Sequence, residues 1–429
     1  MSDDFCGETD KTMKKQKDVH VRYEEIQHAD DRLSDETVVK HTPVERSTSL
    51  SEMSGGEVFL KMEHLQWTGS FKTRGAYNKI SQAVAAGTDN FVAASAGNHA
   101  QGVALAATKC GADSTIVMPE TAPQAKIDAT RSYGSTVELV GQDFQDAMSY
   151  AQTQAEGDST EFVHAYDDPH IVAGQGTLGI EIYEDCPNLD TVVVPIGGGG
   201  LISGVATALN RLSPETRVVG VQAEGAATVH ESLDKGMPVT LDEVSTIADG
   251  IATGGISELT LETVETHVDE IVTVSDTQIA RAVLLLLERA KQVVEGAGAA
   301  PVAAILSDEL DVDGETVVPV LSGGNLDMTM IRTVLSHALT DRRQILRLQV
   351  KINDAPGKME EISGIVADHG ANIHDVQHDR VVPGLNVGEA YLEFQIETSG
   401  AEHADAIIRA IKSSGYTVEE VDRTSDEGI

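Results

Sequence analysis

Aromatic residues and cations are scarce in this chain of 429 residues. Phe, Trp and Tyr together make up 4% of it, and Trp67 is the single tryptophan. Lys and Arg number 31 against 69 Asp and Glu, so the formal net charge is -38. A surface this acidic repels nucleic acid and anionic membranes. We therefore expect neither of them as a partner.

Cysteine and long apolar runs are also scarce. The three cysteines, Cys6, Cys110 and Cys186, are odd in number and lack the spacing of a disulfide framework or a metal site. No stretch reaches the roughly 18 apolar residues of a membrane helix, and residues 1–4 lack the features of a secretion signal. We expect a cytoplasmic protein, and we assign no metal ligands.

The acidic residues are spread along the whole chain instead of being gathered in runs. This distribution indicates adaptation to high salt; the alternative is an ordinary acidic cytosolic enzyme. We expect a higher melting temperature in molar potassium chloride than at about 0.1 M, where the Debye length of about 10 Å leaves like charges interacting. Thermal melts over a salt series measure this. A melting temperature that stays constant or falls with salt would contradict the interpretation.

One lysine occupies a position where a charge is costly. Lys72 follows Phe71 and begins a predicted helix that ends at Gly87. Burying a lysine beside an aromatic ring in a tight turn is unfavourable unless its amine is neutral or covalently used. Lys72 is therefore a candidate Schiff-base lysine. The alternative is that Lys72 and Arg74 are solvated cations at a helix start.

A run of glycines follows the apolar strand predicted at residues 191–196. The run and the first helical residue after it are Gly197, Gly198, Gly199, Gly200 and Leu201. Residues without side chains at a helix N-terminus expose backbone N–H groups to a phosphate. The spaced glycines of a dinucleotide site and the lysine of a nucleotide loop are both missing. A cofactor monophosphate therefore fits better than a nucleotide.

A second loop of small residues lies between a predicted strand and a helix. It consists of Ser95, Ala96, Gly97, Asn98 and His99. Its backbone amides suit a carboxylate, and its side-chain amide suits a phenolic oxygen.

Together these segments resemble the fold-type II pyridoxal phosphate enzymes, most closely the threonine dehydratases (threonine ammonia-lyases), from about residue 41 to residue 338. The segment 321–325, with the sequence Leu-Ser-Gly-Gly-Asn, matches the family's signature at a strand end. The resemblance implies pyridoxal 5'-phosphate as the cofactor. Its Schiff base would form on Lys72, and the loop from Ser95 to His99 would bind the substrate.

The resemblance also implies the other contacts of the cofactor. Phe71 would pack against one face of the ring, and Asn98 would bond the ring hydroxyl. The segment from Gly197 to Leu201 would hold the phosphate, and the Ser322 hydroxyl would face the pyridine nitrogen. Glu295 resembles an acidic turn below the ring, with helix capping as the alternative.

The order of predicted elements indicates an α/β fold with two domains built on parallel sheets. The large domain is expected at residues 21–88 and 169–340, the small domain at 89–168, and a mobile tail at 1–20. Between the domains, Asp168 is expected to cap a helix; a metal or acid–base role is the alternative.

The last segment, residues 344–424, reads as strand, helix, two strands, helix and strand, which is the ferredoxin-like α+β order. With the turn of Asp354, Pro356 and Gly357 it resembles an ACT domain, the amino-acid-binding regulatory module. A ferredoxin-like dimerisation domain without a ligand is the alternative.

The resemblance implies a homo-oligomer, dimer or tetramer, that deaminates the small amino acid threonine, and serine as well, under control of an amino-acid effector. Serine racemase, serine dehydratase, a β-replacement enzyme or an inactive amino-acid sensor are the alternatives. In racemase-like relatives a serine stands where this chain has Ala96, which favours the dehydratase.

Overall fold

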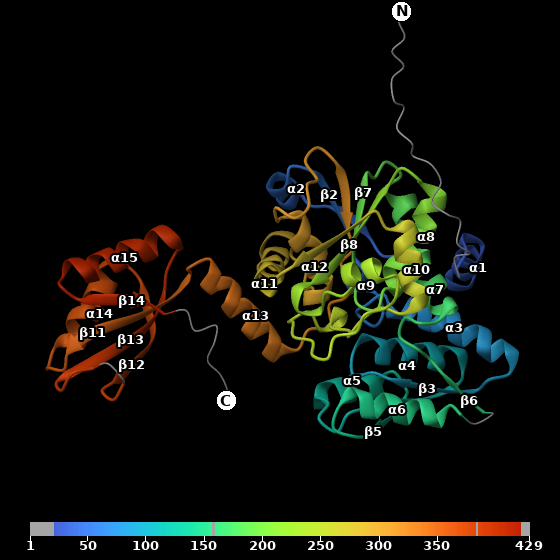
Figure 1. Ribbon diagram of the computed structural model, residues 1–429, viewed down its shortest axis with the longest axis horizontal. Coiled ribbons are helices and arrows are strands. Elements are labelled where there is room, and N and C mark those ends of the chain that lie inside the picture. Colours follow the sequence, from blue (N-terminus) through green and yellow to red (C-terminus); the bar gives the residue numbers. More distant parts are fainter. Residues whose placement is uncertain (1–20, 157–158, 383–384, 422–429) are drawn as a thin grey trace, which may run out of the picture. The chain divides into compact units, whose positions relative to one another are not determined.

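The computed structural model describes residues 21–156, 159–382 and 385–421 (Figure 1). The tail predicted at residues 1–20 lies outside this part. The chain forms two compact units, one up to Asp327 and one from Met328. This boundary precedes the predicted start of the C-terminal domain at residue 344, and the limits within the first unit stay predictions. None of the helices in the described ranges is long and apolar enough to cross a bilayer.

The first unit contains a six-stranded sheet. Its strands, in spatial order, are β1 (Val44–Arg46), β2 (Glu57–Lys61), β10 (Thr316–Pro319), β7 (Thr191–Pro195), β8 (Arg217–Ala223) and β9 (Glu270–Val274). All neighbouring pairs are parallel except β1 and β2. Parallel strands need a crossover between them, and helices supply it.

Helices cover this sheet on both sides (Figure 1). One group consists of α1 (Tyr23–Leu33), α7 (Pro169–Asp185), α8 (Gly200–Leu212), α9 (Val229–Lys235) and α10 (Glu258–His267), and the other of α2 (Thr48–Ser54), α11 (Asp276–Leu285), the π-helical turn η4 (Leu286–Ala290) and α12 (Gly296–Ile305). Short 3₁₀ turns are η1 (Glu63–Leu65), η2 (Glu224–Ala226) and η3 (Asp249–Ile251).

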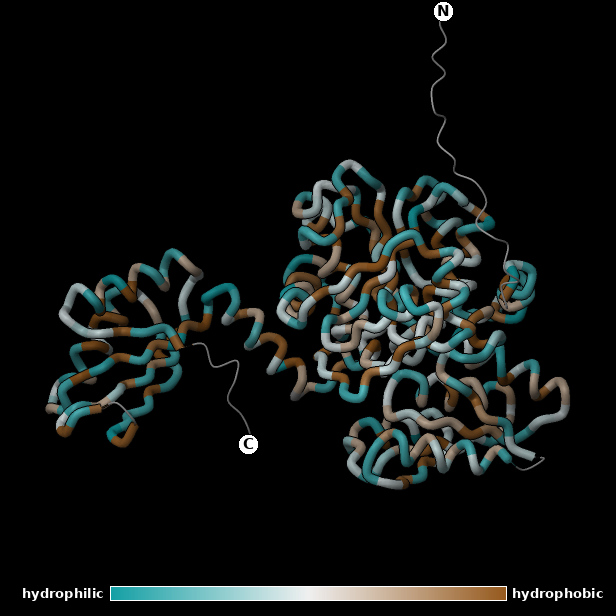
Figure 2. The backbone as a smooth tube through the Cα atoms, viewed as in Figure 1, coloured by the Kyte–Doolittle hydropathy of each residue, from teal (hydrophilic) through white to brown (hydrophobic). Residues whose placement is uncertain are grey.

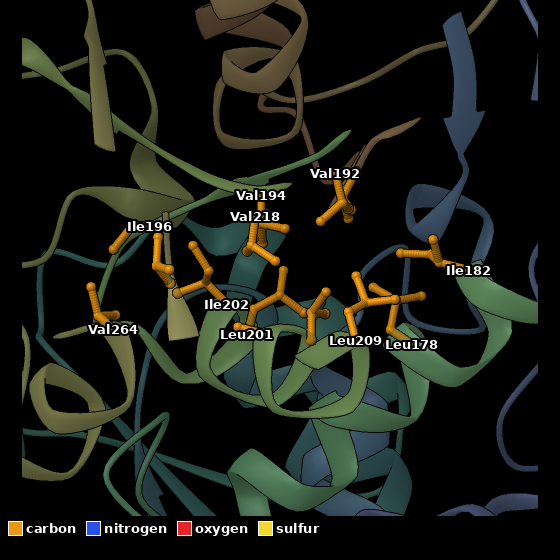
Figure 3. Packing of buried hydrophobic residues seen from close by; sticks show 14 of the residues in the cluster. Leu178, Ile182, Val192, Val194, Ile196, Leu201, Ile202, Leu209, Val218 and Val264 are labelled. Carbon is orange, nitrogen blue, oxygen red and sulfur yellow. The ribbon is translucent and has the colours of Figure 1, made fainter. Parts of the chain in front are cut away.

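A core of fully buried aliphatic side chains joins the sheet to the first group of helices. Val192 and Val194 of β7 face Ile202 and Leu209 of α8 in this core (Figure 3). Strands buried on both faces read as continuous apolar runs, and the sequence of β7 is Thr-Val-Val-Val-Pro. The strand is therefore held rigidly where it runs into the glycine loop.

The second sheet of this unit has the order β5 (Thr136–Leu139), β4 (Asp113–Met118), β3 (Asn90–Ala94) and β6 (Thr160–Phe162), all parallel. Its helices are α3 (Lys72–Ala86), α4 (Asn98–Cys110), α5 (Gln124–Ser132) and α6 (Phe144–Gln154). Alternate residues of β3 enter two separate cores, one with α3 and α4 and one with α6. These two sheets confirm the predicted pair of parallel α/β layers.

The second unit begins with α13 (Met328–Asp341) and continues into an antiparallel sheet. The strands are β12 (Asn372–Asp379), β13 (Glu389–Glu397), β11 (Ile345–Asn353) and β14 (Thr417–Glu420), with helices α14 (Lys358–Asp368) and α15 (Ala401–Ser413). Every second residue of β11 is buried against these helices. The predicted ferredoxin-like order is confirmed, and hydrophobic and hydrophilic residues alternate along this unit (Figure 2).

The prediction for Asp168 is also confirmed. Its side chain accepts hydrogen bonds from the backbone N–H groups of His170 at 2.7 Å and Ile171 at 3.3 Å, and Pro169 occupies the first turn of α7. These contacts satisfy donors that would have no partner within the helix.

Candidate active site

Lys72 is the first residue of α3 and is partly buried. Its Nζ donates a hydrogen bond to Ala165 O at 3.0 Å and lies 5.0 Å from the centre of the Phe71 ring. Loss of hydration on burial lowers the pKa of Lys72 to about 8, although the carboxylate of Glu295 acts in the opposite direction. A substantial fraction of this amine is therefore neutral near pH 8, as a nucleophile for a carbonyl carbon must be.

Arg74, two residues further along, is not a solvated cation. Its guanidinium is buried and donates to both oxygens of Glu63 at 2.8 Å and to Glu181 Oε1 at 2.7 Å. The other oxygen of Glu181 pairs with Lys61 Nζ at 2.7 Å. This buried network of two cations and two carboxylates fixes the start of α3 to β2 and α7.

The glycine loop connects β7 to α8 and has room for backbone alone. A Cβ atom at Gly198 would lie 2.2 Å from the Tyr166 ring, and one at Gly200 would lie 2.9 Å from the Tyr166 Cβ. Gly199 has a φ of 87°, which is in the left-handed region that favours glycine. The first N–H groups of α8 have no partner within the helix. This loop can hold a phosphate group.

The loop of small residues is anchored at both ends. Ser95 N donates to Val117 O at 3.2 Å, and Gly97 N donates to Ser95 Oγ at 3.1 Å. The His99 ring is buried and its Nε2 lies 2.8 Å from Val163 O. Burial, together with the charge of Lys72, lowers the pKa of His99 to about 3, so the ring is neutral. The side chain of His99 therefore holds the loop against Val163.

Asn98 is the first residue of α4, and its side chain bonds to another predicted residue. Its Nδ2 donates to Glu295 Oε1 at 2.7 Å. Glu295 stands at the N-cap position of α12, but its side chain makes no capping hydrogen bond. The interpretation of Glu295 as a helix cap is therefore wrong, because its carboxylate turns toward Asn98.

Ser322 follows β10 and is 2% exposed. Its carbonyl accepts a hydrogen bond from Phe71 N at 3.2 Å, and Ser70 pairs with Gly323 in an antiparallel bridge. A Cβ atom at Gly323 would lie 3.1 Å from Asn98 Nδ2. The Ser322 segment thus joins the lysine segment to the loop of Asn98.

The structure therefore brings all the predicted segments together in the first unit, and it adds residues that the sequence did not reveal. Ala165 and Tyr166 link Lys72 to the glycine loop, and no local pattern marks them. Asn325 belongs to the matched Leu-Ser-Gly-Gly-Asn signature, but the signature does not show which residues its side chain contacts. In the described ranges, no three His, Cys, Asp or Glu side chains converge to hold a metal ion.

These groups fit a phosphorylated pyridine aldehyde. Lys72 supplies an amine, the glycine loop supplies donors for an anion, and Asn98 and Ser322 supply a side-chain amide and a hydroxyl. The Ser70 hydroxyl, beside Phe71, is buried and has no hydrogen-bond partner among the described residues. Fold and site together are those of an enzyme that uses such a cofactor.

Comparisons with known proteins place the chain in a family. Residues 36–323 match the family described as "Pyridoxal-phosphate dependent enzyme", and the chain belongs to this family. Over 399 residues it is 46% identical to the L-threonine ammonia-lyase of Thermotoga maritima, covering 93% of this chain and 99% of that protein.

Solved structures give the same fold. The processed form of threonine deaminase isoform 2 from Solanum lycopersicum superposes with a TM-score of 0.70 at 35% identity, covering 74% of this chain and 93% of that one. Maize serine racemase superposes with a TM-score of 0.69 at 33% identity, covering 75% of this chain and 99% of that one. Deaminases and racemases thus share this fold, so the fold by itself does not distinguish the two activities.

Proposed function

We propose that this protein is an L-threonine ammonia-lyase that converts L-threonine to 2-oxobutanoate and ammonia, and L-serine to pyruvate. The relative of 46% identity carries that name and aligns over 93% of this chain. The observation that carries the proposal is a lysine with a pKa of about 8 in the same site as a glycine loop, an asparagine and a buried serine.

When bound, pyridoxal phosphate supplies an aldehyde for an amine and a ring that withdraws electrons from the substrate Cα. The residues assigned to it are Lys72 for the covalent bond, Phe71 against one ring face, Asn98 for the ring oxygen, Ser322 for the ring nitrogen, and Gly197, Gly198, Gly199, Gly200 and Leu201 for the phosphate. The Ser322 hydroxyl does not keep a ring nitrogen protonated as a carboxylate would, which favours rapid elimination of a β-hydroxyl over prolonged carbanion chemistry.

The protein's own groups then act on the substrate. Backbone amides of the loop Ser95, Ala96, Gly97, Asn98 and His99 bind its carboxylate. With the cofactor and substrate bound, the Nζ of Lys72 would be the group that removes the proton from Cα. Because its pKa is about 8, this amine is basic enough to take the proton and is largely neutral at mildly alkaline pH.

The proposal is tested by incubating the purified protein with L-threonine and measuring 2-oxobutanoate and ammonia. The protein should also show a visible absorption band that borohydride bleaches, since reduction fixes the cofactor on the lysine. A protein with neither the band nor turnover would be an amino-acid sensor, and this proposal would fail.

Ala96 decides between dehydratase and racemase. Racemisation requires a second acid on the face of Cα opposite the lysine, and the methyl group of Ala96 has no proton to donate. We expect L-serine to give pyruvate with little D-serine, and Ala96→Ser to raise the D-serine fraction. Chiral chromatography measures both. Abundant D-serine from the unmodified enzyme would show that another residue supplies the proton.

The C-terminal unit is proposed to be an ACT-like regulatory domain. Its separate compactness from Met328 onward and its ferredoxin-like order support this assignment. We expect a chain ending at Asp327 to keep threonine deamination and to lose its response to amino-acid effectors, because coupling requires a second site. Activity with isoleucine or valine added in turn measures this. An unchanged response in the shortened chain would place the effector site in the first unit.

We also propose a cytoplasmic homo-oligomer, dimer or tetramer, without nucleic-acid or membrane partners. The charge of -38 supports the exclusion of anionic partners. The odd number of cysteines and their spacing, which suits no disulfide framework, support a reducing compartment.

A further inference from the structure

A chain of side-chain hydrogen bonds holds the Asn98 amide in one orientation. Asn325 Nδ2 donates to Asn98 Oδ1 at 2.8 Å, and Asn98 Nδ2 donates to Glu295 Oε1 at 2.7 Å. The Asn325 amide is fixed in turn, because it also donates to Thr68 O at 2.6 Å. An amide nitrogen carries two hydrogens, so the bond to Glu295 leaves Asn98 one N–H for a ligand. Its direction is set by Glu295 and Asn325.

Gly323 and Gly250 leave space for the carboxylate of Glu295, because neither has a side chain. A Cβ atom would lie 2.3 Å from Glu295 Oε1 if Gly323 carried one, and 3.0 Å if Gly250 did. The backbone N–H of Glu295 donates to Gly323 O at 3.1 Å. Two different loops thus accommodate this side chain in the site, where it bonds to Asn98 instead of capping its own helix.

The charge of Glu295 is coupled to its surroundings. Burial raises the pKa of Glu295 to about 7; Asp249 of η3 acts in the same direction, while the hydrogen bond from Asn98 and the charge of Lys126 of α5 oppose it. The backbone N–H of Asn325 also opposes the rise, through a hydrogen bond to the Glu295 carboxylate. Asn325 therefore contacts both Glu295 and Asn98.

We propose that Glu295 and Asn325 are positioning residues of this site. They direct the remaining N–H of Asn98 toward the ring oxygen of the cofactor. This inference rests on the proposed function, since it concerns the same cofactor site.

The affinity of the apoprotein for the cofactor tests whether Glu295 and Asn325 orient Asn98. Apoprotein is titrated with pyridoxal phosphate, and the visible band of the bound form is followed. Glu295→Ala and Asn325→Ala each leave the Asn98 amide without one partner, so we expect affinity to fall about tenfold to a hundredfold. Glu295→Gln retains a carbonyl acceptor and should bind within about threefold of wild type. Glu231→Ala, an exposed carboxylate of α9, is the matched control and should bind as wild type does.

Normal cofactor affinity in both Glu295→Ala and Asn325→Ala would overturn this orienting role. If Glu295→Ala fails to fold, as judged by circular dichroism, Asn325→Ala and Glu295→Gln still decide. Failure of the proposed function is a different result, because the unmodified protein would then form no band at all.

Discussion

Replacing Lys72 by alanine should reduce threonine deamination by at least about a thousandfold, the combined scale of losing a general base and a covalent attachment. The structure gives the reason, because the Nζ of Lys72 is the amine that burial makes available in neutral form beside the glycine loop. Steady-state release of 2-oxobutanoate measures the loss. The visible band should disappear in the same variant.

Lys235→Ala is the matched control for this experiment. Lys235 lies on α9, more than half exposed, in a pair with Glu231 one turn away. Its removal should leave turnover and the band unchanged. If Lys72→Ala deaminated threonine near the wild-type rate with an intact fold, Lys72 would have no part in the mechanism.

Replacing Arg74 by methionine should lower the free energy of unfolding of the first unit by about 3–5 kcal/mol, since it leaves buried carboxylates without their cation. Arg74 is 1% exposed, and Glu63, its bidentate partner, is fully buried. Without Arg74, the buried carboxylates of Glu63 and Glu181 have only the cation of Lys61 in the network, and Lys61 also pairs with Asp185 at 3.3 Å. Urea unfolding followed by circular dichroism measures the change.

Arg46→Met provides the comparison. Arg46 also pairs with a glutamate, Glu57, at 3.0 Å, but both side chains are about half exposed. Exposed ion pairs of this kind contribute about 0–1 kcal/mol to the free energy of unfolding. A similar small effect in Arg74→Met would mean that the buried network does not stabilise the start of α3.

The sequence predicted most of the local structure because local signals mark it. The helix that begins with Lys72 ends at Gly87, whose φ of 106° is left-handed, and Asp168 caps α7. The alternating apolar residues of β11 likewise predicted a strand with one buried face. Such signals are read within a few residues, so their outcome does not depend on distant parts of the chain.

The cofactor and its lysine could be predicted from motif resemblance, and the comparisons confirm the family. The fate of Glu295 could not. Both helix capping and a place in the site agree with its sequence, and its partner Asn98 lies 197 residues away along the chain. Folding of the two sheets against each other selected the second of these possibilities.

The sequence by itself thus determined the α/β elements and the glycine loop, because spacing and side-chain type fix these locally, and its resemblance to a family predicted Lys72 as the reactive lysine. The tertiary structure decided which charges are buried and which amides are oriented. Arg74 could have been a surface cation, yet Glu63 and Glu181 from two other elements enclose it. Desolvation and hydrogen-bond direction depend on every group that surrounds an atom, and only the packed chain brings those groups together.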